Sequence, residues 1–295
     1  MRIRTIEAVF CAACSSSFGG GEPTMTFVQD LAWSPDGARI AYSAMTIDRA
    51  RWEKEQFGAL EGADYEIHVV NEDGSGAKRL TSNPGYDLWI SWSPDGERIA
   101  FGSDRDGRET DIFVMSSRDG SGAARLTRDD GKESAPSFSP DGARIAFMAK
   151  DGKHWQLFVM NADGSDRRRI AESAADDSNP VFSPDGKRLV FYSNRAGAGK
   201  DEVFVVPADG SAPPRAVAEG VFPAWSPDGR SIVFGRKGAL HAIGADGKNL
   251  RRLAEKSEFG RYSPDGKRIA FVAGDFPDTA IWIMSADGSG SRKLQ

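Results

Sequence analysis

The tetrapeptide Ser-Pro-Asp-Gly occurs six times in this chain of 295 residues, at intervals of 37 to 59 residues. The copies begin at Ser34, Ser93, Ser139, Ser183, Ser226 and Ser263. A turn motif that recurs roughly every 40–50 residues is typical of architectures in which each repeat is one supersecondary unit. The sequence therefore predicts six equivalent units, and it directs the search for function toward the loops that they present.

Each tetrapeptide is followed by two short apolar runs, which in the second repeat are residues 98–101 and 112–115. An Asp-Gly pair and a short basic segment close each repeat, as at Asp119 and residues 125–127. Short runs rich in β-branched and aromatic residues, bounded by Pro, Asp and Gly, are typical of strands. Pro presets the backbone of a tight turn, and Gly adopts the positive φ that such a turn requires. We therefore predict an all-β fold, a six-bladed β-propeller with four antiparallel strands per blade.

An aromatic residue precedes every tetrapeptide, and we expect it to pack between neighbouring blades because a four-stranded sheet cannot bury both of its faces alone. These residues are Trp33, Trp92, Phe138, Phe182, Trp225 and Tyr262. We assign residues 25–295 to the propeller and residues 1–24 to a separate N-terminal segment. Ring closure is expected from blade packing alone or with help from an N-terminal strand at residues 3–10.

The N-terminal segment has the pattern of a targeting sequence. Two arginines precede a mostly apolar stretch, and Cys14 is followed by a Ser- and Gly-rich tether at residues 15–21. Residues 12–14 with this tether resemble the processing site of bacterial lipoproteins, which implies a lipid anchor at Cys14. The resemblance favours a periplasmic or cell-envelope location, and the alternative is a cytoplasmic protein with a disordered tail.

Composition excludes several classes of protein. The net charge is −5 and the basic residues form no stripe, so we expect no nucleic-acid partner. No apolar run approaches the roughly 18–20 residues that would span a membrane. No G-x-S-x-G motif occurs, and Cys11 with Cys14 lacks further metal ligands nearby. We therefore expect a protein without enzymatic activity.

The second repeat carries a pattern that identifies a family. It reads WSPDG at 92–96, SDRDG at 103–107, IFVM at 112–115, DGS at 119–121 and RLT at 125–127. This pattern resembles the repeat of the TolB-like (WD-like repeat) six-bladed β-propellers, and the resemblance covers all six repeats. The chain is similar to the propeller of TolB rather than to the whole protein. Similar repeats form the propellers of prolyl oligopeptidases and of oligogalacturonate lyases, so the fold alone does not select a function.

Candidate site residues were sought at equivalent positions at the start of each first strand, where we expect the channel entrance. Six residues before each tetrapeptide stand Val28, Asp87, Glu133, Asp177, Gly220 and Ser257. Four residues before it stand Asp30, Trp89, Ala135, Asn179, Phe222 and Phe259. Carboxylates beside aromatic rings at one rim would suit a cation, a basic peptide or a sugar. The aromatic residues would supply apolar anchors for a partner.

The loops between the second and third strands add further candidates. Arg105, Lys150, Arg195 and Arg236 form a predicted ring of cations that could pair with an acidic polymer. The first repeat carries an insertion between Ser43 and Tyr65, for which we expect one or two helical turns. Its aromatic residue Trp52 and its neighbour Phe57 predict a partial cover of the channel mouth.

These residues together predict a non-enzymatic propeller that binds a protein or peptide at its channel mouth in the bacterial cell envelope. A carbohydrate-active propeller similar to oligogalacturonate lyase, or a saccharide-binding protein, is the alternative. No cofactor is expected; Ca²⁺ is the one metal that the oxygen ligands would suit, at the loop from Asp104 to Asp111.

Overall fold

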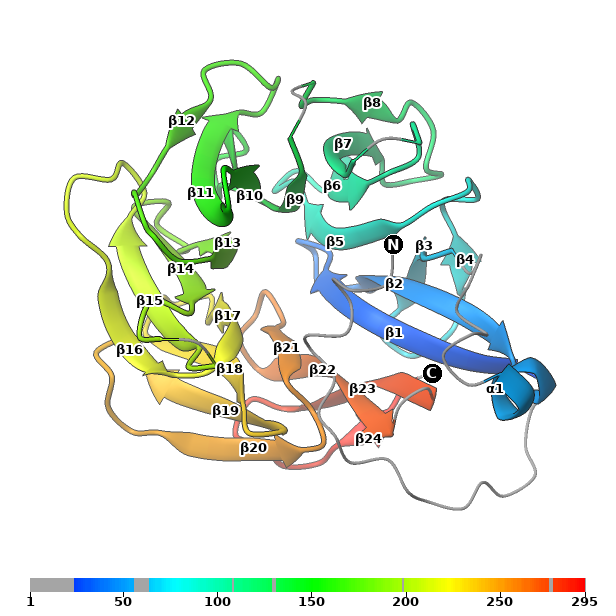
Figure 1. Ribbon diagram of the computed structural model, residues 1–295. Coiled ribbons are helices and arrows are strands. Elements are labelled where there is room, and N and C mark those ends of the chain that lie inside the picture. Colours follow the sequence, from blue (N-terminus) through cyan, green and yellow to red (C-terminus); the bar gives the residue numbers. More distant parts are fainter. Residues whose placement is uncertain are drawn as a thin grey trace.

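The chain folds into six four-stranded antiparallel sheets arranged around one axis, which confirms the predicted six-bladed β-propeller. The computed structural model describes residues 24–55, 64–107, 109–128, 131–197, 199–275 and 278–294. Figure 1 shows that the blades follow one another around the ring in sequence order, each with its first strand nearest the centre.

Every blade is built from four consecutive strands. Blade 1 contains β1 Thr24–Trp33, β2 Arg39–Asp48, β3 Glu66–Asn71 and β4 Lys78–Arg79. Blade 2 contains β5 Asp87–Trp92, β6 Arg98–Ser103, β7 Asp111–Ser116 and β8 Ala124–Arg125. Blade 3 contains β9 Glu133–Phe138, β10 Arg144–Asp151, β11 His154–Asn161 and β12 Arg168–Arg169.

The remaining blades repeat this order. Blade 4 contains β13 Asp177–Phe182, β14 Arg188–Ser193, β15 Glu202–Pro207 and β16 Arg215–Glu219. Blade 5 contains β17 Val221–Trp225, β18 Ser231–Arg236, β19 Ala239–Gly244 and β20 Arg251–Glu255. Blade 6 contains β21 Phe259–Tyr262, β22 Arg268–Asp275, β23 Asp278–Ser285 and β24 Arg292–Lys293.

The tetrapeptide forms the tight turn between the first and second strands. In blade 2, the Gly96 N–H donates to the Ser93 carbonyl at 2.9 Å, and Gly96 has a φ of 74°, which glycine adopts without a steric penalty. The Ser93 hydroxyl and the Glu97 N–H both donate to Asp95, and these bonds lower the pKa of the Asp95 carboxyl. The first strand of each blade therefore ends at one of these turns. We call the end of the propeller axis that carries the turns the turn end, and the opposite end, where the first strands begin, the loop end.

Neighbouring blades meet through a repeated contact between an arginine and an aromatic ring. The arginine that begins the second strand of one blade stacks on the aromatic residue before the next tetrapeptide, as Arg188 does on Trp225 at 4.6 Å. The same stacking joins four further pairs: Arg39 with Trp92, Arg98 with Phe138, Arg144 with Phe182, and Arg268 with Trp33. The predicted packing of the aromatic residues between blades is confirmed.

The contact between blades 5 and 6 departs from this pattern, because Ser231 stands where the other blades have arginine. We expect Ser231→Arg to raise the free energy of unfolding by about 0.5–1 kcal/mol through stacking on Tyr262. Arg188→Ser should lower it by a similar amount at the equivalent contact. Urea denaturation would measure both, and a destabilised Ser231→Arg beside an unaffected Arg188→Ser would show that the stacking contributes nothing.

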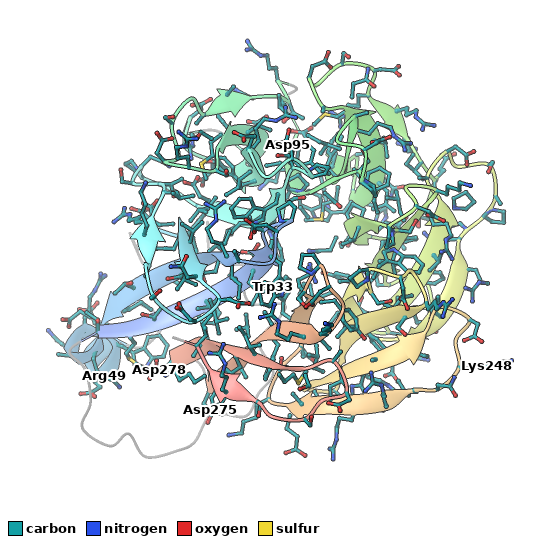
Figure 2. The ribbon with its side chains drawn as sticks, turned by 180° about the vertical axis from the view of Figure 1, so that it is seen from behind. Trp33, Arg49, Asp95, Lys248, Asp275 and Asp278 are labelled. Carbon is teal, nitrogen blue, oxygen red and sulfur yellow. The ribbon has the colours of Figure 1, made fainter. Side chains whose placement is uncertain are left out.

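The ring closes by packing of blade 6 on blade 1. The Val28 N–H donates to Thr279 Oγ1 at 2.8 Å, and the Trp33 indole donates to the Arg261 carbonyl at 3.2 Å. Trp33 lies near the centre in Figure 2, and Arg49 approaches Asp278 at the lower left edge of the same view, with 3.7 Å between their charged atoms. Blades 1 and 6 each have four strands of their own, and residues 3–10 lie outside the described part.

The insertion of the first repeat extends the β1–β2 hairpin and then forms α1, Arg49–Glu55, as the predicted helical turns. Trp52 on this helix is buried in a cluster with Met25, Phe27 and Tyr65, apart from the cluster that surrounds the axis. Figure 1 places α1 at the outer end of the hairpin. The described part of the insertion therefore does not cover the channel mouth, because its aromatic side chain packs on its own hairpin; Phe57 lies outside the described residues.

Candidate functional site at the propeller axis

The first strands carry an irregularity where they approach the axis. Strand registers shift at Val28/Asp30, Leu88/Ser91, Ser178/Val181 and Val221/Ala224, and on the β10 side of blade 3 at Ala146/Met148. At the position four residues before the tetrapeptide, Trp89, Ala135, Asn179 and Phe222 have φ values of 61°, 51°, 52° and 52°. Non-glycine residues occupy this left-handed region at a cost of about 1–2 kcal/mol, and such outliers concentrate at functional sites.

Two of these strained residues meet across the axis. The rings of Trp89 and Phe222 stack with their centroids 5.9 Å apart, although Trp89 belongs to blade 2 and Phe222 to the opposite blade 5. Phe222 also contacts Phe259 and Tyr192, with centroids 5.9 and 5.3 Å away. We call these four residues the axial aromatic cluster. Phe222 and Phe259 are buried, whereas Trp89 and Tyr192 are partly exposed, so the cluster places two partly accessible rings at the axis.

Asp30 fixes the backbone of Trp89. Its carboxylate accepts the N–H groups of Ile90, at 2.7 Å, and of Trp89, and it also accepts the Ser43 hydroxyl. Two consecutive N–H groups that converge on one anion form a nest, and a residue in the left-handed region makes this geometry possible. Burial raises the pKa of Asp30 despite these bonds. Asp30 stands four residues before its tetrapeptide, as Trp89 and Phe222 do, but the sequence gave no reason to select it as a site residue.

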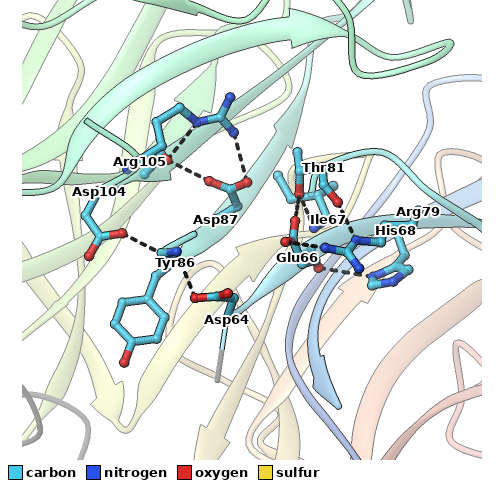
Figure 3. A network of polar contacts seen from close by, with 12 residues as sticks. Asp64, Glu66, Ile67, His68, Arg79, Thr81, Tyr86, Asp87, Asp104 and Arg105 are labelled. Carbon is cyan, nitrogen blue, oxygen red and sulfur yellow. Dashed lines mark hydrogen bonds and ion pairs between the residues drawn. The ribbon is translucent and has the colours of Figure 1, made fainter. Parts of the chain in front are cut away.

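The predicted rim carboxylates lie inside the blades instead. Asp87, Glu133 and Asp177 are fully buried. Arg105 donates to Asp87 at 2.9 Å, and Figure 3 shows the two side chains facing each other. Arg195 donates to both oxygens of Asp177 at 2.7 and 2.8 Å.

Blade 3 repeats this arrangement with an arginine from the outer part of the blade. Arg167 lies 3.1 Å from Glu133 and stacks on Phe147 and Phe158. Arg105 and Arg195 each stack on a phenylalanine pair in the same way, on Phe101 with Phe113 and on Phe191 with Phe204. Each carboxylate is therefore part of a charged core within its own blade, and its contact with a partner stays a prediction.

The predicted loop cations likewise make contacts within the chain. Arg105 and Arg195 are the arginines just described, Arg236 pairs with Glu219 at 3.1 Å, and the Lys150 ammonium lies 5.6 Å from the centre of the Trp155 ring. These cations already have partners within the chain. Asn179 shares the strained axial position of Trp89 and is buried.

A second polar network lies between the third and fourth strands, and the sequence gave no expectation of it. In blade 1, buried Glu66 accepts from Arg79 at 2.6 Å and from the Thr81 hydroxyl (Figure 3). In blade 2, Arg125 lies 2.8 Å from Asp111. The repeated Arg-Leu-Thr segment was the available signal, because it brings arginine and threonine to the same strand end in both blades.

The loop considered for calcium uses its carboxylates in protein contacts. Asp104 accepts the Tyr86 N–H at 2.7 Å, while Asp106 and Asp111 both lie within ion-pair distance of Arg125. Within the described ranges, no three His, Cys, Asp or Glu side chains are grouped so that they could hold a metal ion. The same ranges contain no helix long and apolar enough to cross a membrane.

The fold and its repeats define the class, a six-bladed β-propeller with TolB-type blades. The family model of the TolB beta propeller domain matches residues 121–295, which is more than half of the chain. The chain therefore belongs to the TolB β-propeller family.

Individual proteins agree with this assignment. A segment is 34% identical over 93 residues to a TolB homolog of Chlorobium chlorochromatii, covering 30% of this chain and 20% of that protein. This chain spans only 11 to 25% of the length of the curated relatives that it matches. The structure of TolB from Acinetobacter baumannii has a TM-score of 0.68 at 20% identity, covering 91% of this chain and 79% of that one. An oligogalacturonate lyase in complex with manganese has a TM-score of 0.55 at 13% identity, covering 89% and 90%, which shows a shared fold alone.

Proposed function

We propose that this propeller is a non-enzymatic scaffold that binds a protein or peptide at the loop end of its axis, in the bacterial cell envelope. The observation that carries the proposal is the axial aromatic cluster, in which Trp89 is partly exposed while its ring and its strained backbone are both held in place. An aromatic side chain fixed before binding loses little conformational entropy on association. Buried aromatic anchors commonly supply most of the binding energy of an interface.

The experiment is affinity capture from soluble and envelope fractions of the native cell, with bound proteins identified by mass spectrometry. Trp89→Ala should lose the partner, because it removes the larger of the two partly exposed rings of the cluster. Phe222 is unsuitable for this test because its ring lies inside the cluster. The cell fraction from which the partner is recovered, soluble or envelope, also tests the proposed location in the cell envelope.

Trp282→Ala is the matched control, since it removes a partly exposed tryptophan from the third strand of blade 6. Retention of the partner by both variants would show that the axial site is not the interface. If the wild-type protein captures nothing from either fraction, the protein-binding proposal fails, and glycan screening would then address the carbohydrate alternative.

A further inference from the structure

Arg261 in β21 is a partly exposed cation beside the axis that uses little of its hydrogen-bonding capacity. Its guanidinium carbon lies 4.1 Å from the centre of the Phe259 ring, and its Nη1 donates to the Gly260 carbonyl at 3.1 Å. A guanidinium has five N–H donors. Within the described ranges, this bond is the only one that its guanidinium makes, and no carboxylate lies within ion-pair distance of it.

Asp30 is the nearest acidic group that acts on Arg261, but it does not satisfy it. The two oxygens of Asp30 already accept the Ser43 hydroxyl and the N–H groups of Ile90 and Trp89. Burial lowers the pKa of Arg261 to about 10, so its side chain remains a cation at neutral pH. The N–H donors of Arg261 that make no bond within the described ranges are therefore available to an added anion.

The equivalent position in the other five blades is occupied by small side chains. Two residues before the tetrapeptide stand Ala32, Ser91, Ser137, Val181 and Ala224. Arg261 is therefore the single large and charged side chain at this level of the ring. It lies two residues closer to the turn end than the strained axial position.

We propose that Arg261 binds a carboxylate group that enters along the axis from the turn end. The planar guanidinium, supported on one face by Phe259, presents paired N–H donors that match the two oxygens of a carboxylate. The negative charge of Asp30 nearby favours a monoanion over a phosphate dianion. The carboxylate belongs either to a small organic acid or to the C-terminus of a peptide, and this site is separate from the partner surface proposed at the loop end.

Differential scanning calorimetry of the full chain tests the proposal. Sodium acetate should raise the Tm of the wild-type protein saturably above its value in sodium chloride of equal ionic strength. Arg261→Gln should abolish this rise. Arg188→Gln is the matched control, because it removes another partly buried arginine that stacks on an aromatic ring, and it should keep the acetate response.

A short N-acetylated peptide, supplied as the free acid and as the C-terminal amide, distinguishes the two sources. A rise with acetate and with the free acid but not with the amide assigns the site to chain ends, and a rise with acetate but neither peptide assigns it to small acids. Equal Tm values in acetate and chloride, or an unchanged acetate response in Arg261→Gln, would overturn the proposal.

Because Arg261→Gln could unfold, ¹⁵N NMR of the arginine side chains of the wild-type protein gives a second readout. The Nε signal that disappears in Arg261→Lys should shift with acetate, and a signal that stays in place would also refute the site.

Discussion

Asp177→Ala is expected to lower the free energy of unfolding by about 3 kcal/mol, because it leaves the guanidinium of Arg195 without its counterion. Asp177 is fully buried and accepts both hydrogen bonds from Arg195 Nη2, while the Arg195 side chain is 23% exposed. The stacking of Arg195 on Phe191 and Phe204 holds the guanidinium in place, so it cannot turn fully into water. Urea denaturation at neutral pH would measure the loss.

Asp275→Ala is the matched control for this prediction. Asp275 lies 2.8 Å from Lys256, but the two side chains are 53% and 67% exposed, so losing this pair should cost less than about 1 kcal/mol. Replacing both Asp177 and Arg195 with leucine should restore much of the stability lost in Asp177→Ala, since no unpaired charge remains. Equal losses for Asp177→Ala and Asp275→Ala would show that burial adds nothing to the Asp177 pair.

The fold could be predicted from the sequence because its signal is local and repeated. The tetrapeptide contains the proline, the acceptor and the glycine that a tight turn requires, so six copies determine where six hairpins lie. The aromatic residue before each copy identified the packing between blades for the same reason. Each of these interactions lies within one repeat or between consecutive repeats.

The environment of the candidate site residues could not be predicted in the same way. Counting back from the tetrapeptide placed Asp87 and Asp177 correctly along their strands, but it could not show that Arg105 and Arg195 reach back over 18 residues to pair with them. Asp30 and Arg261 are 231 positions apart in the sequence, and Asp30 influences Arg261 electrostatically only because the ring closes. The stacking of Trp89 on Phe222 likewise depends on which blades are opposite, a property of the ring rather than of any repeat.

Phe222→Ala is expected to lower the free energy of unfolding by about 3–5 kcal/mol, the range found for removal of a buried phenylalanine. Phe222 contacts Trp89, Tyr192 and Phe259, so its loss leaves a gap at the centre of the axial aromatic cluster. Its backbone adds a second, separable effect. Phe222 has a φ of 52°, where alanine is strained and glycine is not. Phe222→Gly should therefore be more stable than Phe222→Ala by about 0.5–1 kcal/mol, although glycine is the more flexible residue in the unfolded chain.

Phe113 provides the control, because it is buried to a similar extent but lies in β7, whose pairing with both neighbouring strands has no register shift. There the order should reverse, and Phe113→Gly should be less stable than Phe113→Ala by about 0.5–1 kcal/mol. The comparison separates the loss of the ring, which is common to all four variants, from the strain of the backbone, which is present at Phe222 alone. If glycine is the worse substitution at both positions, the left-handed backbone at the axis carries no strain, and the axial aromatic cluster is held by packing of its rings alone.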